Sequence, residues 1–465
     1  MSKSTTRKRK KNKISVCDPG VRVTHRDAAG IDIGSETHYV AVPADRDAKP
    51  VRTFGCLTPD LHELARWLKD CRIRTVAMES TGVYWIPVAR VLEHHGLQVC
   101  LTDARQLRNV SGRKTDVCDC QWLQQLHSYG LLAGAFRPTP QLEVLRSYWR
   151  QRERLVNGSS RQIQRMQKAL EQMNLQLHKV LSDIAGKTGQ AIIRAIVGGE
   201  RNPEYLVALC HQNCKRSRED FVKALTGYYR EDHLFALEQT VELFDVYQEK
   251  LHALDQRIQR YMRSLEQQCD KDELAQRSDR KRRSTKRRKN QPHFDLRGEL
   301  YALTGVDLTQ IPGIDAMTAQ TVITEQGIDM TQFPSDKHFA SHLGLCPNHT
   351  ITGGKIRKRR TRKVQSRAAR ALRIASQSLE RNDSALGAFY RRMKGRHGPA
   401  KAITATAHKL AKLTYRMLKH GEDYVHTGQE QYERQYQKHR FKSLVKQARI
   451  MGYELLDVET GQVLS

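Results

Sequence analysis

Two long apolar repeats in the middle of the chain constrain its fold most. In residues 142–184 and again in 234–265, apolar residues recur at steps of three and four or their sums, and only Arg152 and Ser159 interrupt the first repeat. This spacing lines one face of an α-helix with apolar side chains, so we expect two long helices with a smaller helical insertion between them. They form either a coiled-coil hairpin or ordinary bundle helices. Both arrangements suit a spacing or dimerising role.

The N-terminal part of the chain predicts a sheet covered by helices. AAGIDIGSETHYVAVPAD (28–45) indicates a strand that turns back into an antiparallel neighbour, and KPVRTFGCL (49–57) can add a third strand. The next segments alternate in type: a helix at 60–71, a strand at 74–80, a helix at 83–96, a strand at 97–104 and a helix that carries Asp116. Three meandering strands followed by such units predict a mixed α/β sheet with helices on its faces.

Four carboxylates fall where this fold would bring them together. Asp32 ends the apolar run of the first strand, and Glu79 closes the strand at 74–80. Asp116 and Asp119 stand three positions apart, hence on one face of the following helix. The first and fourth strands of such a sheet lie side by side, and the helix can pack across their ends. Each acid alone suits a turn or a helix cap. Jointly they predict two Mg²⁺ ions for phosphodiester chemistry, because converging carboxylates need countercharge and Mg²⁺ prefers oxygen ligands.

The C-terminal third carries motifs typical of phosphate contact. LTGVDLTQIPGIDAMTAQTVITEQG (303–327) resembles a helix-hairpin-helix, in which Gly313 lets backbone N–H groups face a phosphate. A Gly-Gly turn then opens onto a basic loop at 355–363 and a helix, and a final amphipathic helix begins near Pro399. The predicted nucleic-acid-binding residues are Gly313, Lys355, Arg357, Lys358, Arg359, Arg360, Arg362 and Lys363.

The charge of the chain indicates its partners. It has 80 Lys and Arg against 50 Asp and Glu, a formal net charge of +30, and dense cationic runs at 4–13, 281–289 and 355–363. Three runs spread over one chain favour a long nucleic-acid path. No apolar stretch approaches the roughly 18 residues of a membrane span, and the scattered cysteines suit a reducing compartment. We expect a cytoplasmic, nucleoid-associated protein with no membrane partner.

These observations divide the chain into consecutive parts. The boundaries we predict are a disordered basic tail at 1–26, an α/β domain at 27–140, a coiled-coil or helical middle at 141–269, a basic linker at 270–299, a mostly α-helical domain at 300–425 and a tail of unassigned role at 426–465.

At its four carboxylates the sequence resembles the DEDD transposases of bacterial insertion sequences, the class named after insertion sequence 110. The matching stretches run in the same order from about residue 27 to 420: GIDIGSETHYVAVP, AMESTGVYWIP, GRKTDVCDCQWLQQLHSYGLL, LTQIPGIDAMTAQTVI and LGLCPNHTITGGK. The resemblance implies a RuvC-like nuclease domain of the ribonuclease-H type, a coiled-coil middle and a C-terminal transposase domain. It also implies that Asp32, Glu79, Asp116 and Asp119 form the catalytic, metal-binding tetrad.

The resemblance further implies a covalent step and an RNA partner. In this family a serine just before a glycine attacks the scissile phosphate, and members studied as recombinases pair donor and target DNA through a structured RNA. The matching position here is Thr352, in ITGG. Threonine can act as a nucleophile when activated, but its β-methyl restricts χ1 and crowds an in-line attack. Thr352 is therefore either the nucleophile, which we favour, or the mark of a weakened copy. Ser366 is expected to cap its helix or contact a phosphate.

We therefore expect a Mg²⁺-assisted recombinase that excises and inserts its own element, with donor DNA, target DNA and a guide RNA as partners. Strand exchange between two duplexes favours a homodimer or homotetramer. A junction-resolving nuclease that uses water as its nucleophile would need the tetrad but not Thr352. A non-catalytic RNA-binding protein with a degenerate nuclease fold would need neither, and the presence of all four carboxylates counts against it.

Overall fold

The computed structural model of the chain describes residues 23–80, 82–102, 116–212, 214, 216–270, 273–274, 290–353, 355–362, 364, 366–422, 434, 437–438, 441–456 and 463–464. The predicted basic tail as far as residue 22 and the cationic run at 281–289 lie outside the described residues. The chain divides into two compact units, unit 1 (residues 1–137) and unit 2 (residues 138–465). No helix in the described part of the chain has the length and apolar character needed to cross a membrane.

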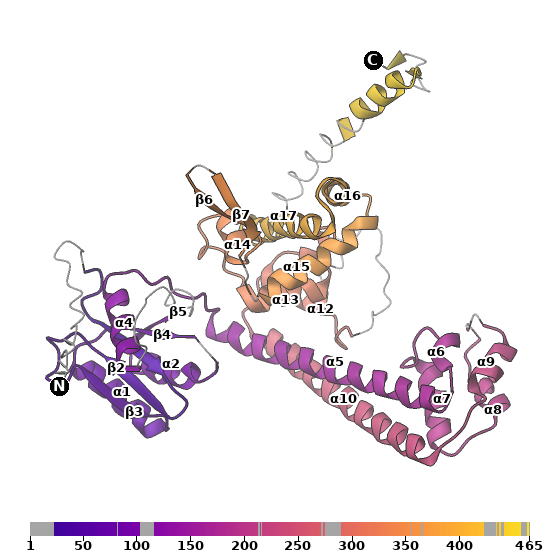
Figure 1. Ribbon diagram of the computed structural model, residues 1–465, viewed down its shortest axis with the longest axis horizontal. Helices are drawn as coiled ribbons and strands as arrows, with labels where there is room; N and C mark the ends of the chain where they lie inside the picture. The colour runs from indigo at the N-terminus through magenta and orange to yellow at the C-terminus, as the bar shows by residue number, and fades with distance from the viewer. Residues whose placement is uncertain are drawn as a thin grey trace, which may run out of the picture. The chain divides into compact units, whose positions relative to one another are not determined.

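Unit 1 contains a five-stranded sheet in the order β3-β2-β1-β4-β5 (Figure 1). Its strands are β1 (Ala28–Ile33), β2 (Thr37–Ala41), β3 (Val51–Gly55), β4 (Thr75–Glu79) and β5 (Gln98–Thr102). β1 pairs antiparallel with β2 and parallel with β4, so the sheet is mixed, as predicted. The order follows from the connections, because tight turns join antiparallel strands whereas parallel strands need a longer crossover.

One face of this sheet is covered by α1 (Thr58–Asp70) and α2 (Trp85–His94). Leu64 of α1 and Leu92 of α2 share one buried core with Ile31 of β1 and Met78 of β4. Because side chains alternate along a strand, the residues on either side of Ile31 and Met78 point to the opposite face.

The opposite face is covered by α4 (Asp116–Ser128), which packs on β1, β2 and β4. This helix approaches β1 so closely that a Cβ placed on Gly30 would stand 2.4 Å from the carbonyl oxygen of Cys120 and 2.4 Å from the backbone nitrogen of Gln124. A residue without a side chain therefore sets the distance between the helix and the sheet.

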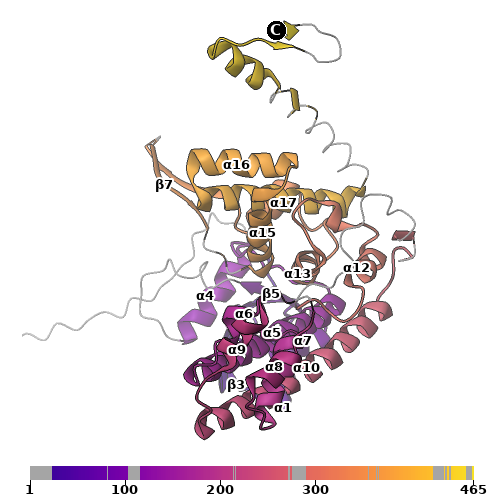
Figure 2. The ribbon, with the colours of Figure 1, turned by 90° about the vertical axis from the view of Figure 1, so that its right-hand side faces the viewer.

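Unit 2 is built on two long helices, α5 (Pro140–Gln172) and α10 (Glu231–Ser264), which lie side by side (Figures 1 and 2). They run antiparallel, because Tyr261 near the end of α10 bonds Gln141 at the start of α5, while Gln248 bonds Ser159 further along. The described part of the insertion between them holds α6 (Leu177–Val180), α7 (Lys187–Val197), α8 (Pro203–Ala208) and α9 (Arg218–Leu225). The predicted pair of helices with a helical insertion is confirmed, and its coiled-coil character stays a prediction.

The first apolar repeat behaves differently from the expectation at two points. It extends to residue 184 in the sequence, but α5 ends at Gln172 and Asn174 adopts a left-handed conformation (φ 57°) that breaks the helix. The residues that interrupt the repeat are not exposed. Arg152 is buried and bonds Asp255 of α10, with 2.5 Å between Nε and Oδ1, and Ser159 is buried too. The repeat is interrupted where polar side chains join the two helices.

The rest of unit 2 is mainly helical in its described part. Its elements are α12 (Leu296–Thr304), the 3-10 turn η1 (Leu308–Gln310), α13 (Ala316–Gln326), α14 (Asp336–His342), β6 (Pro347–Thr352), β7 (Lys355–Thr361), α15 (Arg367–Ser378), the 3-10 turn η2 (Leu379–Arg381), α16 (Ala385–His397), α17 (Pro399–His420), β8 (Leu455–Leu456) and β9 (Val463–Leu464). The final amphipathic helix begins at Pro399, as predicted, and α17 packs against α14, α15 and α16.

One secondary-structure prediction in this region is wrong. The basic segment expected as a loop at 355–363 is largely strand β7, which pairs antiparallel with β6. The reason is local: β6 and β7 pair from Thr352 and Lys355 outward, and β-branched residues in both strands favour extended backbone. Lys355 and Arg357, two positions apart on β7, are exposed on a strand as they would be on a loop.

Candidate active site

Asp32 and Glu79 lie at the carboxyl ends of two adjacent parallel strands. Asp32 is the fifth residue of β1, Glu79 is the last residue of β4, and the pairing of Ile31 with Met78 places the two acids next in register. Both follow a residue of the core formed with α1 and α2, so alternation directs both to the face covered by α4. The sheet thus brings together two acids that are far apart in the sequence.

The direction of α4 places its first turn at the same end of the sheet. His127, in its last turn, bonds Thr75 at the start of β4, with 2.8 Å between Nε2 and Oγ1. The middle of the helix rests on Gly30 in the middle of β1. α4 therefore runs antiparallel to β1 and β4. Its first turn, with Asp116 and Asp119, lies toward the carboxyl ends of these strands. Of Asp116, the structure describes the backbone.

Two of these carboxylates act on the thiol of Cys120. Burial is the main cause that raises the pKa of its thiol to about 12, and the negative charges of Asp32 and Asp119 raise it further. Both carboxylates therefore act on one thiol, and the three residues come from β1 and α4. Cys120 itself is fully buried and holds α4 against the sheet.

The acids offer a donor set suited to hard divalent cations, because all of them coordinate through oxygen. Within the described residues, however, no three His, Cys, Asp or Glu side chains lie close enough to hold a metal ion. The side chains of Asp32, Glu79 and Asp119 therefore do not form a metal-binding group by themselves, and the side chain of Asp116 lies outside the described residues.

Thr352 lies in unit 2, whereas the four acids lie in unit 1. It is the last residue of β6 and pairs with Lys355 across the Gly-Gly turn, with its side chain exposed at the tip of the hairpin. The other predicted nucleic-acid residues of this segment fall into three groups: Lys355, Arg357 and Arg362 are exposed, only the backbone of Lys358, Arg359 and Arg360 is described, and Lys363 lies outside the described residues. Ser366 caps α15 by accepting a hydrogen bond from the Ala369 amide at 3.1 Å. Of the two roles expected for it, a helix cap or a phosphate contact, the cap is confirmed.

The turn at Gly313 gives a structural reason for glycine at this position, independent of any phosphate contact. Its backbone is left-handed (φ 91°), and a Cβ would stand 3.0 Å from Cγ of Leu379 and 3.1 Å from the carbonyl oxygen of Ala375. Both the turn and the close packing on α15 and η2 therefore require glycine at this position. The helix-hairpin-helix and its phosphate contact stay predictions.

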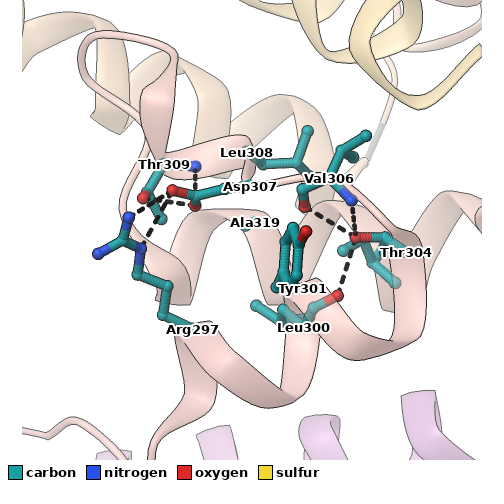
Figure 3. A pocket seen from close by; sticks show the side chains of 10 residues that line it. Arg297, Leu300, Tyr301, Thr304, Val306, Asp307, Leu308, Thr309 and Ala319 are labelled. Atoms are coloured by element: carbon teal, nitrogen blue, oxygen red, sulfur yellow. Dashed lines mark hydrogen bonds and ion pairs between the residues drawn. The ribbon is translucent and has the colours of Figure 1, made fainter. Parts of the chain in front are cut away.

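The loop that precedes this turn is held by the buried Asp307. Its Oδ2 accepts a hydrogen bond from Arg297 at 2.5 Å and its Oδ1 accepts one from Thr309 at 2.6 Å (Figure 3). Oδ2 also accepts one from Gln310 at 2.8 Å. Burial would raise the pKa of Asp307, but these hydrogen bonds outweigh it and hold the pKa below its usual value. The pocket beside this network offers about 10 Å³, the room of one water molecule. It is a structural support and not a ligand site.

Comparison with known families gives one match that covers the four acids and a second that covers Gly313 and Thr352. A family model described as "Transposase", built on DEDD transposases, matches residues 29–175 and includes the four acids. A second, described as "Transposase IS116/IS110/IS902 family", matches residues 307–391 and includes Gly313 and Thr352. No curated protein matches the chain. Two transposase models match successive parts of the chain, and the chain belongs to the IS110-type DEDD transposases, enzymes that recombine DNA.

Proposed function

We propose that this transposase excises and inserts its element through a covalent bond between Thr352 and DNA, assisted by divalent ions at Asp32, Glu79, Asp116 and Asp119. The observation that carries the proposal is the placement of Asp32 and Glu79 at adjacent strand ends, on the face where α4 begins. Asp119 stands on α4, and its charge and that of Asp32 both act on the Cys120 thiol, which supports the proposal. Such a site belongs to phosphodiester chemistry, which is the chemistry of a DNA transposase.

The covalent step follows from the chemistry of a hydroxyl group. Oγ1 of Thr352 gives up its proton and attacks the scissile phosphorus. The Oγ1–P bond forms as the bond from phosphorus to one deoxyribose oxygen breaks, and that leaving oxygen takes up the proton. A hydroxyl of the second DNA strand then attacks the same phosphorus, which restores a phosphodiester and returns the proton to Thr352. The exposure of Thr352 at a hairpin tip supports this role, since a nucleophile must reach a backbone that approaches from solvent.

The carboxylates would hold the ions, which we infer to be two Mg²⁺. Bound there, the ions would offset the charge that develops on the attacking and leaving oxygens. The residues of the chain do the positioning. Gly30 fixes the distance of α4 from β1, and the bond between His127 and Thr75 fixes the far end of that helix.

The nucleic-acid partners follow from charge and from the second domain. The exposed Lys355 and Arg357 on β7 would contact phosphates beside Thr352. The net charge of +30 exceeds what a single duplex needs, which supports a structured guide RNA in addition to donor and target DNA. We infer a homodimer or homotetramer, because two duplexes must be cut and joined.

Strand exchange on plasmids that carry the ends of the element tests the proposal. Asp119→Asn and Thr352→Ala should each abolish exchange, whereas Glu63→Gln, an exposed acid on α1, and Thr361→Ala, a threonine at the other end of the hairpin, should leave it intact. Full exchange by both Asp119→Asn and Thr352→Ala would end the proposal.

Denaturing gels separate the covalent scheme from its rivals. We expect the wild-type protein to carry labelled DNA. Asp119→Asn should carry only traces of it, and Thr352→Ala should carry none. Cleavage without attached protein would favour a hydrolytic junction nuclease. Tight RNA binding with no cleavage in any divalent ion would favour a non-catalytic RNA-binding protein.

A further inference from the structure

A cavity of about 250 Å³ opens in unit 2 between α5, α13 and α15, away from the hairpin that carries Thr352. These three helices pack together, α13 against both of the others (Figure 1). The volume lies near the lower end of the range for small-molecule sites. The charged residues that line it are Arg150, Arg152, Glu153, Glu325, Arg367 and Arg370.

Two of the four arginines are fixed parts of the wall. Arg150 forms a two-pronged pair with the buried Glu325, at 2.8 Å and 2.6 Å. Arg152 is held by the buried Asp255. In both pairs the carboxylate is buried, and forked pairs of this kind hold their geometry. The side of the cavity formed by α5 is therefore rigid and cationic before any ligand arrives.

The other two arginines are more available. Arg367 pairs with Glu153, and its Nε also lies 4.0 Å from Oε1 of Glu325, which is already held by Arg150. The side chains of Arg367 and Glu153 are both more than two-fifths exposed, and exposed pairs of this kind are weak. Arg370, one turn further along α15, is exposed at the cavity. Burial lowers the pKa of Arg367, and the positive charges of Arg150 and Arg370 lower it further. The guanidinium groups thus repel one another, and an anion would relieve that repulsion.

The remaining lining is apolar. Trp149 forms part of the wall, and its indole N–H donates to Oγ1 of Thr321 at 3.2 Å, which fixes the ring. Ile374, which also lines the cavity, is 60% exposed and adds apolar surface there. A fitting ligand therefore combines an anionic group with a flat, apolar body.

We propose that this cavity binds one nucleotide of a single-stranded nucleic-acid segment, with the phosphate on Arg367 and Arg370 and the base against Trp149 and Ile374. The inference rests on the proposed nucleic-acid function and adds a site that holds an unpaired strand. Unpaired bases are the ones free to enter such a cavity. The phosphate takes the place of Glu153 beside Arg367.

Two matched pairs of variants test the site in the full-length protein. Arg370→Gln removes a cavity charge, and Arg373→Gln removes one from the same helix outside the cavity. Glu153→Gln frees Arg367, and Glu171→Gln neutralises an exposed acid on the same helix, α5, away from the cavity. Binding of fluorescent oligo(dT), oligo(U) and a duplex is measured by anisotropy in EDTA, so that strand exchange plays no part.

We expect Arg370→Gln to weaken single-strand binding about tenfold and to reduce the salt slope by about one, relative to Arg373→Gln. Glu153→Gln should tighten the same binding severalfold relative to Glu171→Gln, and duplex binding should change little. The dT and U probes show whether the strand is DNA or RNA. Equal affinities within each matched pair would overturn the proposal, as would stronger competition by polyglutamate than by oligonucleotide. An enzyme without strand exchange would contradict the proposed function and leave this result intact.

Discussion

Gly30 shows how a residue without chemistry can control the candidate site. A methyl group there would meet backbone atoms of α4 at 2.4 Å, and backbone cannot move aside as a flexible side chain can. We predict that Gly30→Ala displaces α4, lowers the free energy of unfolding of unit 1 by about 1–3 kcal/mol and abolishes strand exchange. Gly134→Ala is the control, because its added Cβ would lie an ordinary 3.6 Å from Sγ of Cys100.

This measurement is possible because the tryptophans are unevenly placed. Three of the four, Trp67, Trp85 and Trp122, belong to unit 1, and Trp149 belongs to unit 2. Urea unfolding followed by tryptophan fluorescence in a Trp149→Phe background therefore reports unit 1. An unchanged midpoint for Gly30→Ala would contradict the close contact between α4 and β1.

Thr352 supports a second prediction at the scale of one residue. Its β-methyl restricts χ1 and crowds in-line attack, and its exposed place at the hairpin tip leaves room for the smaller serine. Thr352→Ser should therefore form the covalent DNA adduct several times faster than wild type, whereas Thr352→Val should form none. The rate of adduct formation on denaturing gels is the measurement. A serine variant slower than wild type would mean that the methyl group positions the hydroxyl.

At the scale of elements, α5 and α10 are joined by a buried ion pair. Arg152 and Asp255 are 3% and 1% exposed, and Asp255 also accepts hydrogen bonds from His293. Asp255→Ala should cost about 3–5 kcal/mol, because it leaves a buried guanidinium without a carboxylate. Asp245→Ala is the matched control on the same helix, since its pair with Arg194 is nearly half exposed and such pairs contribute about 1 kcal/mol or less.

A double variant separates the two explanations of that loss. Arg152→Met with Asp255→Leu removes both charges and should be less destabilised than Asp255→Ala alone. The quantity compared is the urea midpoint of the helical signal in circular dichroism. If the double variant were the less stable of the two, the loss would come from the backbone contacts at His293 and not from the stranded charge.

α4 is fastened to the sheet by a histidine that stays neutral. Burial, and then the positive charge of the stacked His25, lowers the pKa of His127 to about 4. The unfolded chain binds a proton near its usual pKa of about 6.5, so unit 1 loses stability as the pH falls from 6.5 toward 4, by up to about 3 kcal/mol. His127→Gln, which keeps a partner for Thr75, should show a shallower loss. His38 and His95, whose pKa values are also lowered mainly by burial, contribute to the slope that remains.

The elements of this chain were predictable because each follows from a local pattern. The strands of unit 1 and the long helices of unit 2 come from periods of two and of three to four, and the neighbours in the sheet come from the order of turns and crossovers. Asp32 and Glu79 could be placed together for that reason. Contacts between distant segments could not be predicted. Arg150 and Glu325 lie 175 positions apart, and each resembles an ordinary surface residue in the sequence. The strand β7 was missed because cationic density hid its short β-branched pattern.

At the scale of the whole molecule, charge governs the affinity for nucleic acid. With a net charge of +30, binding of non-specific duplex DNA should fall steeply with salt, because each phosphate contact releases condensed counterions. The contribution of the β6–β7 hairpin to this salt dependence can be measured separately. Lys355 and Arg357 are exposed on β7, and replacing both by glutamine should reduce the slope of log affinity against log salt by about two if each contacts a phosphate.

The control for this prediction removes the same charge elsewhere. Arg161 and Lys168 are exposed on α5, and their replacement by glutamine changes the net charge equally. Long-range attraction depends on the total charge and would alter both double variants alike, mainly through the association rate. A phosphate contact depends on the position of the cation, so only the hairpin double variant should show a smaller slope of log affinity against log salt. Anisotropy titrations across a range of salt concentrations measure it, and equal slopes for the two double variants would remove the hairpin from the DNA-binding surface while leaving Thr352 to be placed by other residues.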